Sequence, residues 1–296
     1  MRRKLTNQEI LSIPKMYENG LSSWAISKQM RIDHKSILNY LNKSKTNIRN
    51  KSEAAKLGVK EGRIIIKRNI IPLNLRLNKD LSYILGVLAG DGYLTYNNKL
   101  RRYQIGLNAT DKKFVNEFKK SLISFFQITP TNEFKKSKKV NWNDQYATRL
   151  CSKEACDYIN SIGEFRKENW TVPKIIKESD EDVKCTFIKG FFDSEGEIDK
   201  QIGRVGATSM NLEGLKEIQE LLNDLKIRST IILVKDLRPN TSQKYRLRIN
   251  DKKSIILFND LIGFTIQRKQ QILDQFVNNH RREAVLFPRD RDRLTP

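Results

Sequence analysis

The chain has 296 residues, enough for one large domain or about two or three small ones, and its 38% hydrophobic content suits a packed protein. Its 56 Lys and Arg residues against 34 Asp and Glu residues give a formal charge of +22, which favours nucleic acid as partner, with an anionic membrane surface as the main rival. The absence of any run of about 18 apolar residues excludes a spanning helix, and three cysteines with two histidines exclude a disulfide framework and a zinc site.

Residues 1–48 are predicted to form a module of three helices. Thr6 and Glu9 have the spacing of a capping box that opens the first helix, and Pro14 should kink or shorten that helix. Asp33 can cap the third helix. The second helix is predicted to carry Trp24, Ile26 and Met30, and the third helix to turn Ile37, Leu38 and Leu41 inward.

The second and third helices are short and are joined by about three residues, a pattern typical of a helix-turn-helix. The outward face of the third helix is polar and rich in hydrogen-bond donors, as the readout of base edges requires. Its predicted DNA contacts are Lys35, Ser36, Asn39 and Tyr40. A three-helix bundle without a ligand is the alternative. Residues 49–79 follow as a basic linker, with one helical turn over residues 53–57 capped by Ser52, which either lies along phosphates or acts as a spacer.

The remainder of the chain contains an internal repeat. YILGVLAGDGYL (83–94) matches FIKGFFDSEGEI (187–198), and YATRLCSKEACDYINSIG (146–163) matches YRLRINDKKSIILFNDLIG (245–263) with one extra residue. Both copies have the same order of segments, which predicts helix, two strands, helix, two strands and helix. The predicted fold class is α+β, a pseudo-two-fold duplication of αββαββα halves with two antiparallel sheets. The halves span 80–180 and 181–280, and a tail covers 281–296.

Each copy carries small residues four positions apart on one helical face, namely Gly86 and Gly90 in the first and Gly190 and Ser194 in the second. Small faces let two helix backbones approach more closely than the usual ~8–10 Å. An acid follows each stripe, so a two-fold contact would bring Asp91 and Glu195 together. These two anions, each at a helix C-terminus, would repel each other and require a cation.

A hard divalent metal with oxygen ligands meets that requirement, because Mg²⁺ uses one or two protein carboxylates and completes its shell with water and phosphate. Metals bridged by such carboxylates suit in-line phosphodiester hydrolysis. We expect about two or three Mg²⁺ sites, with Mn²⁺ as a substitute, held by Asp91, Glu195 and the preceding Gly90 and Ser194. One Gly-Asp-Gly after an apolar helix is typical of an ordinary helix end, but two equivalent acids in a basic, duplicated chain favour a catalytic centre.

The two blocks resemble the paired helices of the LAGLIDADG homing endonucleases in their monomeric, two-copy form, over residues 80–280. The resemblance implies a saddle whose sheets lie in the DNA major groove, and Mg²⁺-dependent cleavage of both strands with 3′ overhangs. It assigns the metal-binding acids to Asp91 and Glu195. It also implies a basic residue near each scissile phosphate after an Ile-Gly pair, which places Lys167 and Lys269 in catalytic roles.

One departure from the family is Ala89, a position where many members carry an acid, while the second copy keeps Asp193. Polar residues of the alternating strands are predicted to contact DNA, namely Arg101, Arg102, Gln104, Lys200, Gln201, Arg204, Lys244, Arg246 and Arg248. A predicted phosphate-binding loop carries Lys135, Lys136, Lys138 and Lys139.

These features predict a site-specific endonuclease for double-stranded DNA that acts as a monomer and belongs to an intron, an intein or a free-standing mobile element. Intron RNA is a further expected partner, a membrane is not, and the expected location is the cytoplasm, with the nucleoid or an organelle matrix as alternatives. A DNA-binding regulator of the same fold that does not cut, and a maturase acting on intron RNA, are the competing hypotheses. The regulator could dispense with one acid, so the presence of both favours the enzyme.

Overall fold

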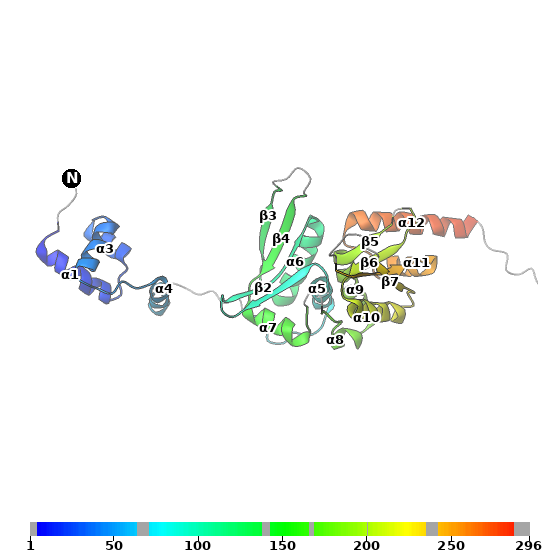
Figure 1. The fold of residues 1–296 in the computed structure, drawn as a ribbon, viewed down its shortest axis with the longest axis horizontal. Coiled ribbons are helices and arrows are strands. Elements are labelled where there is room, and N and C mark those ends of the chain that lie inside the picture. Colours follow the sequence, from blue (N-terminus) through cyan, green and yellow to red (C-terminus); the bar gives the residue numbers. More distant parts are fainter. Residues whose placement is uncertain are drawn as a thin grey trace, which may run out of the picture. The chain divides into compact units, whose positions relative to one another are not determined.

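The structure is a computed structural model (Figure 1). It describes residues 5–63, 71–137, 143–165, 169–199, 201–234 and 242–286, without the side chains of 280 and 282–286. The chain divides into two compact units, Met1–Arg68 and Asn69–Pro296, which are described separately. Across these described ranges, no helix combines the length and apolar character needed to cross a membrane.

The first unit consists of the helices α1 (Asn7–Glu18), α2 (Ser23–Met30), α3 (His34–Lys43) and α4 (Lys51–Lys60). The predicted capping box at the start of α1 is present, because Glu9 N donates to Thr6 Oγ1 and Thr6 N donates to Glu9 Oε2. The predicted shortening at Pro14 is wrong, since α1 continues through it. Ile13 and Tyr17, on either side of Pro14, are both buried, and this packing holds the helix together across the missing N–H.

The core of this unit contains Ile13, Tyr17, Ile26, Ile37 and Leu41. Two of the apolar residues predicted for the second and third helices lie outside this core. Trp24 is 69% exposed, because it precedes the buried Ile26 by two positions and therefore lies on another side of α2. On α3, positions 37, 40 and 41 share one helical face. Tyr40 therefore packs partly against this core, whereas Leu38 lies outside it.

Part of the predicted linker belongs to this first unit. The Arg49 guanidinium donates to the carbonyl oxygens of Tyr17 (3.0 Å) and Leu21 (2.6 Å) and lies 4.0 Å from the centre of the Tyr17 ring. Immediately after it, Asn50 caps α4 in a capping box with Glu53. The predicted single turn capped by Ser52 is therefore a ten-residue helix that begins two positions earlier, with Asn50 as its cap.

The second unit contains the two predicted halves. The first comprises α5 (Lys79–Ala89), β1 (Gly92–Asn97), β2 (Arg102–Ala109), α6 (Lys112–Phe126), β3 (Thr131–Lys135), β4 (Gln145–Leu150) and α7 (Lys153–Ile162), followed by α8 (Lys174–Lys177). The second comprises α9 (Glu181–Glu195), β5 (Gly196–Ile198), β6 (Val205–Ser209), α10 (Leu212–Asp224), β7 (Thr230–Val234), β8 (Lys244–Ile249) and α11 (Lys252–Leu261), followed by α12 (Gln267–Leu286). The sheet orders β1-β2-β4-β3 and β5-β6-β8-β7 are equivalent and every pairing is antiparallel, which confirms the duplicated α+β fold.

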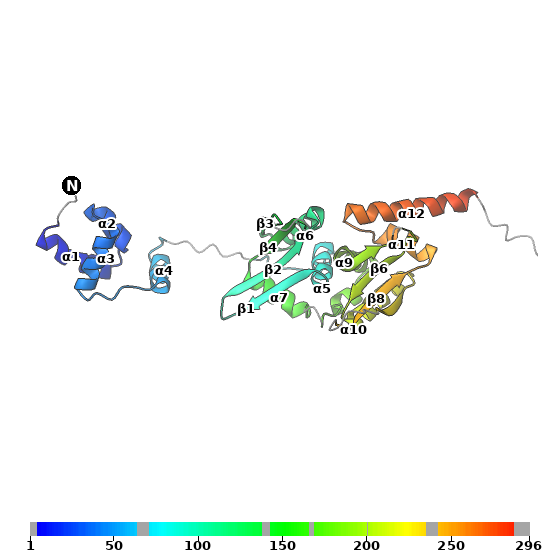
Figure 2. The ribbon, with the colours of Figure 1, turned by 45° about the horizontal axis from the view of Figure 1, so that its top comes forward.

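Each sheet buries one face against helices and leaves the other face open. In the first half, Ile105, Leu107 and Leu150 are fully buried, and α6 and α7 pack on this side. In the second half, Leu247 and Ile249 have the same role. The alternating strand pattern therefore turns the intervening polar residues to the open faces. Between the two sheets, α5 and α9 lie side by side in both views of the fold (Figures 1 and 2).

Candidate active site between the two halves

The helices α5 and α9 touch through their small residues. A Cβ atom at Gly86 would overlap the backbone carbonyl oxygen of Phe187, and one at Gly190 would lie 2.5 Å from the carbonyl oxygen of Tyr83. One turn further along, a Cβ at Gly90 would collide with the side chain of Ser194. The two backbones are in direct contact, as the spacing of small residues predicts.

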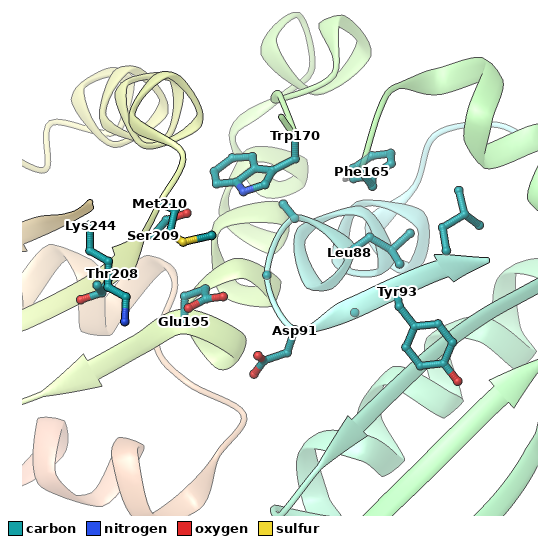
Figure 3. A pocket seen from close by; sticks show the side chains of 14 residues that line it. Leu88, Asp91, Tyr93, Phe165, Trp170, Glu195, Thr208, Ser209, Met210 and Lys244 are labelled. Atoms are coloured by element: carbon teal, nitrogen blue, oxygen red, sulfur yellow. The ribbon is translucent and has the colours of Figure 1, made fainter. Parts of the chain in front are cut away.

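This contact brings the two acids to one cavity. Asp91 directly follows Gly90, the C-cap of α5, and Glu195 is the last residue of α9. Both line a cavity of about 740 Å³ between the halves. Figure 3 shows the two carboxylates near each other, with Trp170 and Phe165 above them in that view. Asp91 is exposed and Glu195 is half-buried, so both are accessible to solvent and to a ligand.

The donor set of this cavity fits a hard cation that keeps part of its shell for water and phosphate. Two carboxylates come from two different elements, and the described ranges contain no cluster of three or more His, Cys, Asp or Glu residues around a common point. Gly90 also lines the cavity. Ser194 is absent from that lining and its hydroxyl donates to Gly190 O at 3.1 Å, so its backbone carbonyl is the more suitable oxygen for a metal.

A buried lysine accompanies the acid of the second half. Lys269 is 6% exposed, and its Nζ donates to the carbonyl oxygens of Phe192 (3.2 Å) and Asp193 (2.9 Å) in the last turn of α9. Burial lowers the pKa of Lys269 to about 8, although Asp193, Asp91 and Glu195 act in the opposite direction. The ammonium group therefore lies within electrostatic reach of both acids and offsets the negative end of the helix. Its predicted counterpart Lys167 lies outside the described residues.

The helix that ends at Glu195 is held by a buried carboxylate, Asp193, which has no equivalent in the helix before Asp91. Asp193, almost fully buried, accepts hydrogen bonds from the Tyr83 hydroxyl and from Thr265 N, both at 2.8 Å, and so connects the two halves. Burial raises the pKa of Asp193, while the hydrogen bonds from Thr265 and Tyr83 lower it. The repeat places Ala89, Phe187 and Phe165 at the three equivalent positions. All three are buried and apolar, so the first half lacks both the acid and the hydroxyl that form the bridge.

This bridge leads to a stability prediction. Tyr83→Phe should lower the free energy of unfolding in urea by about 1–3 kcal/mol, because a buried carboxylate loses a donor. Tyr96→Phe is the matched control, since the Tyr96 hydroxyl donates to Asp157 at 2.6 Å on the exposed surface. We expect a change below about 0.5 kcal/mol there. Equal losses in both variants would show that the Tyr83–Asp193 bond has no special role.

The open face of the second sheet collects several predicted DNA contacts. In β8, Lys244, Arg246 and Arg248 alternate with the buried Leu247 and Ile249. Arg246 Nε lies 3.1 Å from Thr208 Oγ1 and 3.0 Å from Glu197 Oε1. The Nε atoms of Arg204 and Arg248 are buried and have no hydrogen-bond partner among the described residues. Lys244 also lines the cavity that holds the two acids.

The first sheet carries an arginine that the sequence interpretation missed. Arg149 pairs with Gly106 across β2 and β4, just as Arg248 pairs with Gly206 across β6 and β8. Arg149 forms an ion pair with Glu133 of the neighbouring strand. The matched blocks beginning at positions 146 and 245 contained the signal, since they align these two arginines.

Other predicted contacts take different places. Arg102 and Gln104 are on β2 as expected, with Arg102 Nε 3.1 Å from Gln104 Oε1. Arg101 is not on a strand but in the preceding turn, with a left-handed φ of 49°, and Gln201 lies in the turn between β5 and β6. Lys135 is the last residue of the edge strand β3 rather than a loop residue, and the exposed Lys136 follows it. Lys138, Lys139 and Lys200 lie outside the described residues.

Comparisons with known proteins point to one family. Residues 182–263 match the model of the LAGLIDADG-like domain. An uncharacterized protein of Methanocaldococcus jannaschii is 28% identical over 220 residues, which cover 70% of this chain and 74% of that protein. A second uncharacterized protein of that organism is 36% identical over 141 residues, or 47% of this chain and 49% of that protein.

The glutamine–fructose-6-phosphate aminotransferase of Methanocaldococcus jannaschii is 28% identical over 202 residues, which cover 67% of this chain but only 17% of the enzyme. The chain therefore spans less than half the length of two of these three relatives. Among solved structures, the homing endonuclease I-DmoI in complex with DNA and Mn aligns over 62% of this chain and 96% of that chain, with 23% identity and a TM-score of 0.46.

Proposed function

We propose that the chain is a member of the LAGLIDADG family and an endonuclease that cuts double-stranded DNA at specific sites with divalent metal ions. The observation that carries the proposal is the shared cavity lined by Asp91 and Glu195 at the ends of two touching helices. Without a cation, this arrangement places two like charges at the negative ends of two helices. A phosphodiester substrate with bound Mg²⁺ would supply both the cation and the remaining oxygen ligands.

In this proposal each residue has a definite task. Asp91 and Glu195 would hold the metal, with the carbonyl oxygens of Gly90 and Ser194 as further donors. When bound, the metal supplies an activated water and stabilises the leaving oxygen. Lys269 fixes the last turn of α9 by donating to two of its carbonyl oxygens, and its charge favours a phosphate nearby. Lys167 is proposed for the same role in the first half.

The open faces of the two sheets would contact the DNA on either side of the cut. The arginines Arg149 and Arg248 occupy equivalent positions there, which suits guanine contacts in the major groove. A threonine faces each arginine, Thr131 in the first half and Thr230 in the second. The halves differ two residues further along the edge strand, where Glu133 forms an ion pair with Arg149 and the equivalent residue is Ile232. A single chain with two unlike faces suits an asymmetric target, and we propose that it acts as a monomer.

The recurrence of this segment in unrelated proteins supports a mobile-element origin. It matches part of an aminotransferase, a probable translation initiation factor and an RNA polymerase subunit of one organism, and covers only 17%, 18% and 22% of them. Those names denote unrelated activities, so the shared segment brings a function of its own rather than the function of its host.

Cleavage of a random duplex library by the purified chain with Mg²⁺, followed by sequencing of the cut ends, tests this proposal. We expect a defined asymmetric site cut in both strands with 3′ overhangs, and a single 34.6 kDa protomer on each DNA molecule. DNA binding without metal-dependent cleavage would support the regulator instead. Activity restricted to structured intron RNA would support the maturase.

We also propose that the first unit is a helix-turn-helix DNA reader. On α3, Lys35 and Asn39 are exposed, Ser36 is half-buried, and Tyr40 is engaged partly with the core. Deletion of residues 1–63 should weaken DNA binding and flatten its salt dependence, by about 0.9 in log–log slope for each phosphate that the shortened chain no longer neutralises. Cleavage at high protein concentration should persist. Fluorescence anisotropy over a salt series measures both quantities, and unchanged affinity and slope would remove the DNA-reading role.

A further inference from the structure

The first unit displays a large aromatic ring on its surface in a fixed orientation. Trp24 is 69% exposed, and its ring stacks on that of His34 with the centroids 4.2 Å apart and the planes 8° from parallel. The His34 ring is fixed in turn, because its Nε2 lies 2.9 Å from the hydroxyl of Ser23. An exposed indole normally samples several rotamers, and this stack restricts it before any ligand binds.

The surroundings of the Trp24–His34 pair are basic. Between residues 19 and 52 the chain contains seven Lys and Arg residues and a single acid, Asp33. Lys28, one helical turn after Trp24, and Lys35, directly after His34, are both exposed. The pair also lies at the starts of α2 and α3, where backbone N–H groups favour anions. A polyanion is therefore the partner whose charge complements this surface.

We propose that the Trp24–His34 pair is a docking surface for the sugar–phosphate backbone of duplex DNA. The indole face would lie against a deoxyribose, and its N–H, a hydrogen-bond donor without an acceptor partner among the described residues, would donate to a phosphate oxygen. The inference rests on the proposed DNA reading by the first unit. It places a sequence-neutral contact beside the outward side chains of α3, which fixes the register of that helix on the DNA.

The test uses the full chain, EDTA to prevent cleavage, and a labelled mixed-sequence duplex of about 30 base pairs. Trp24→Ala should weaken binding about fivefold to thirtyfold, by analogy with the loss of other aromatic contacts to nucleic acids. Leu11→Ala is the matched control, because Leu11 is 72% exposed on α1 of the same unit, and it should leave the affinity unchanged. Equal losses in both variants, or parental affinity of Trp24→Ala, overturn the inference.

A fluorescence measurement adds a readout that a change in stability would not mimic. DNA should quench or shift the indole emission of the parent chain, and this change should be clearly smaller in Trp24→Phe, which keeps the other two tryptophans, one of them Trp170 in the cavity lining. A response to single-stranded RNA with none to duplex DNA would also overturn the inference. The variant Lys35→Ala distinguishes a failure of the aromatic contact from a failure of DNA reading by the first unit. If Lys35→Ala weakens binding and Trp24→Ala does not, the first unit still reads DNA without the aromatic contact, whereas if neither changes the affinity, both proposals fail.

Discussion

Asp91→Asn and Glu195→Gln are each expected to lower double-strand cleavage by at least about 10³-fold, equivalent to ~4 kcal/mol of transition-state stabilisation. Each variant keeps the shape of the side chain but loses a charge that would hold the metal. Because both acids line the same cavity, neither half should cut normally when one acid is neutral. DNA affinity in Ca²⁺ should stay within about threefold of the parent, since most binding comes from phosphate contacts elsewhere.

A second readout of the same variants does not depend on activity. Without metal, removal of either charge should change the free energy of unfolding little, because the repulsion between the two carboxylates is opposed by the attraction of each to Lys269. Added Mg²⁺ should stabilise the parent more than either variant, as expected for a ligand that binds only the folded state. A metal-independent loss of stability in both variants would mean that the acids are structural.

Asp224→Asn is the matched control for both measurements. Asp224 also ends a helix, α10, but it pairs with Lys184 on the surface, away from the cavity. We expect parental cleavage and no change in the stabilisation by Mg²⁺. If Asp224→Asn reduced cleavage as strongly as Asp91→Asn, the loss would reflect the overall charge rather than the candidate site.

The sequence predicted the centre of this site because the information is local and repeated. Two stripes of small residues predict which faces of the two helices are in contact, and the acid after each stripe predicts that Asp91 and Glu195 lie close together. The structure reproduces this contact at Gly86 and Gly190. The repeat also contained the equivalence of Arg149 and Arg248, which emerges only when every aligned position is compared.

The remaining features depend on contacts between distant residues. Tyr83 and Asp193 are 110 positions apart, and nothing periodic connects them. Trp170 lies in the first half, between α7 and α8, but packs into the second half, where its ring meets Phe191 and fills the space beside Gly214. Asn211 Nδ2 also donates to its carbonyl oxygen at 2.5 Å. A single aromatic residue in an irregular segment carries no pattern from which such partners could be predicted.

Gly86→Val is expected to lower the free energy of unfolding of the second unit by about 3 kcal/mol or more, near the upper end of the cost of overpacking. The added side chain would occupy the position of the Phe187 carbonyl group, which is backbone and cannot rotate away. The whole of α5 from Leu81 to Ala89 is buried, so the helix has no open side toward which it could move. Equilibrium unfolding in urea measures the loss.

The same substitution should separate Asp91 from Glu195, because both follow the helical contact directly. Stabilisation by Mg²⁺ should therefore disappear together with cleavage, even where the variant remains folded. Gly163→Ala provides the control, since Gly163 is extended, with φ −179°, and a Cβ there would be at least 3.4 Å from its neighbours. It should change stability by less than about 1 kcal/mol. If Gly86→Val instead kept both its stability and its response to Mg²⁺, the close approach of the two helices could not be what assembles the metal site.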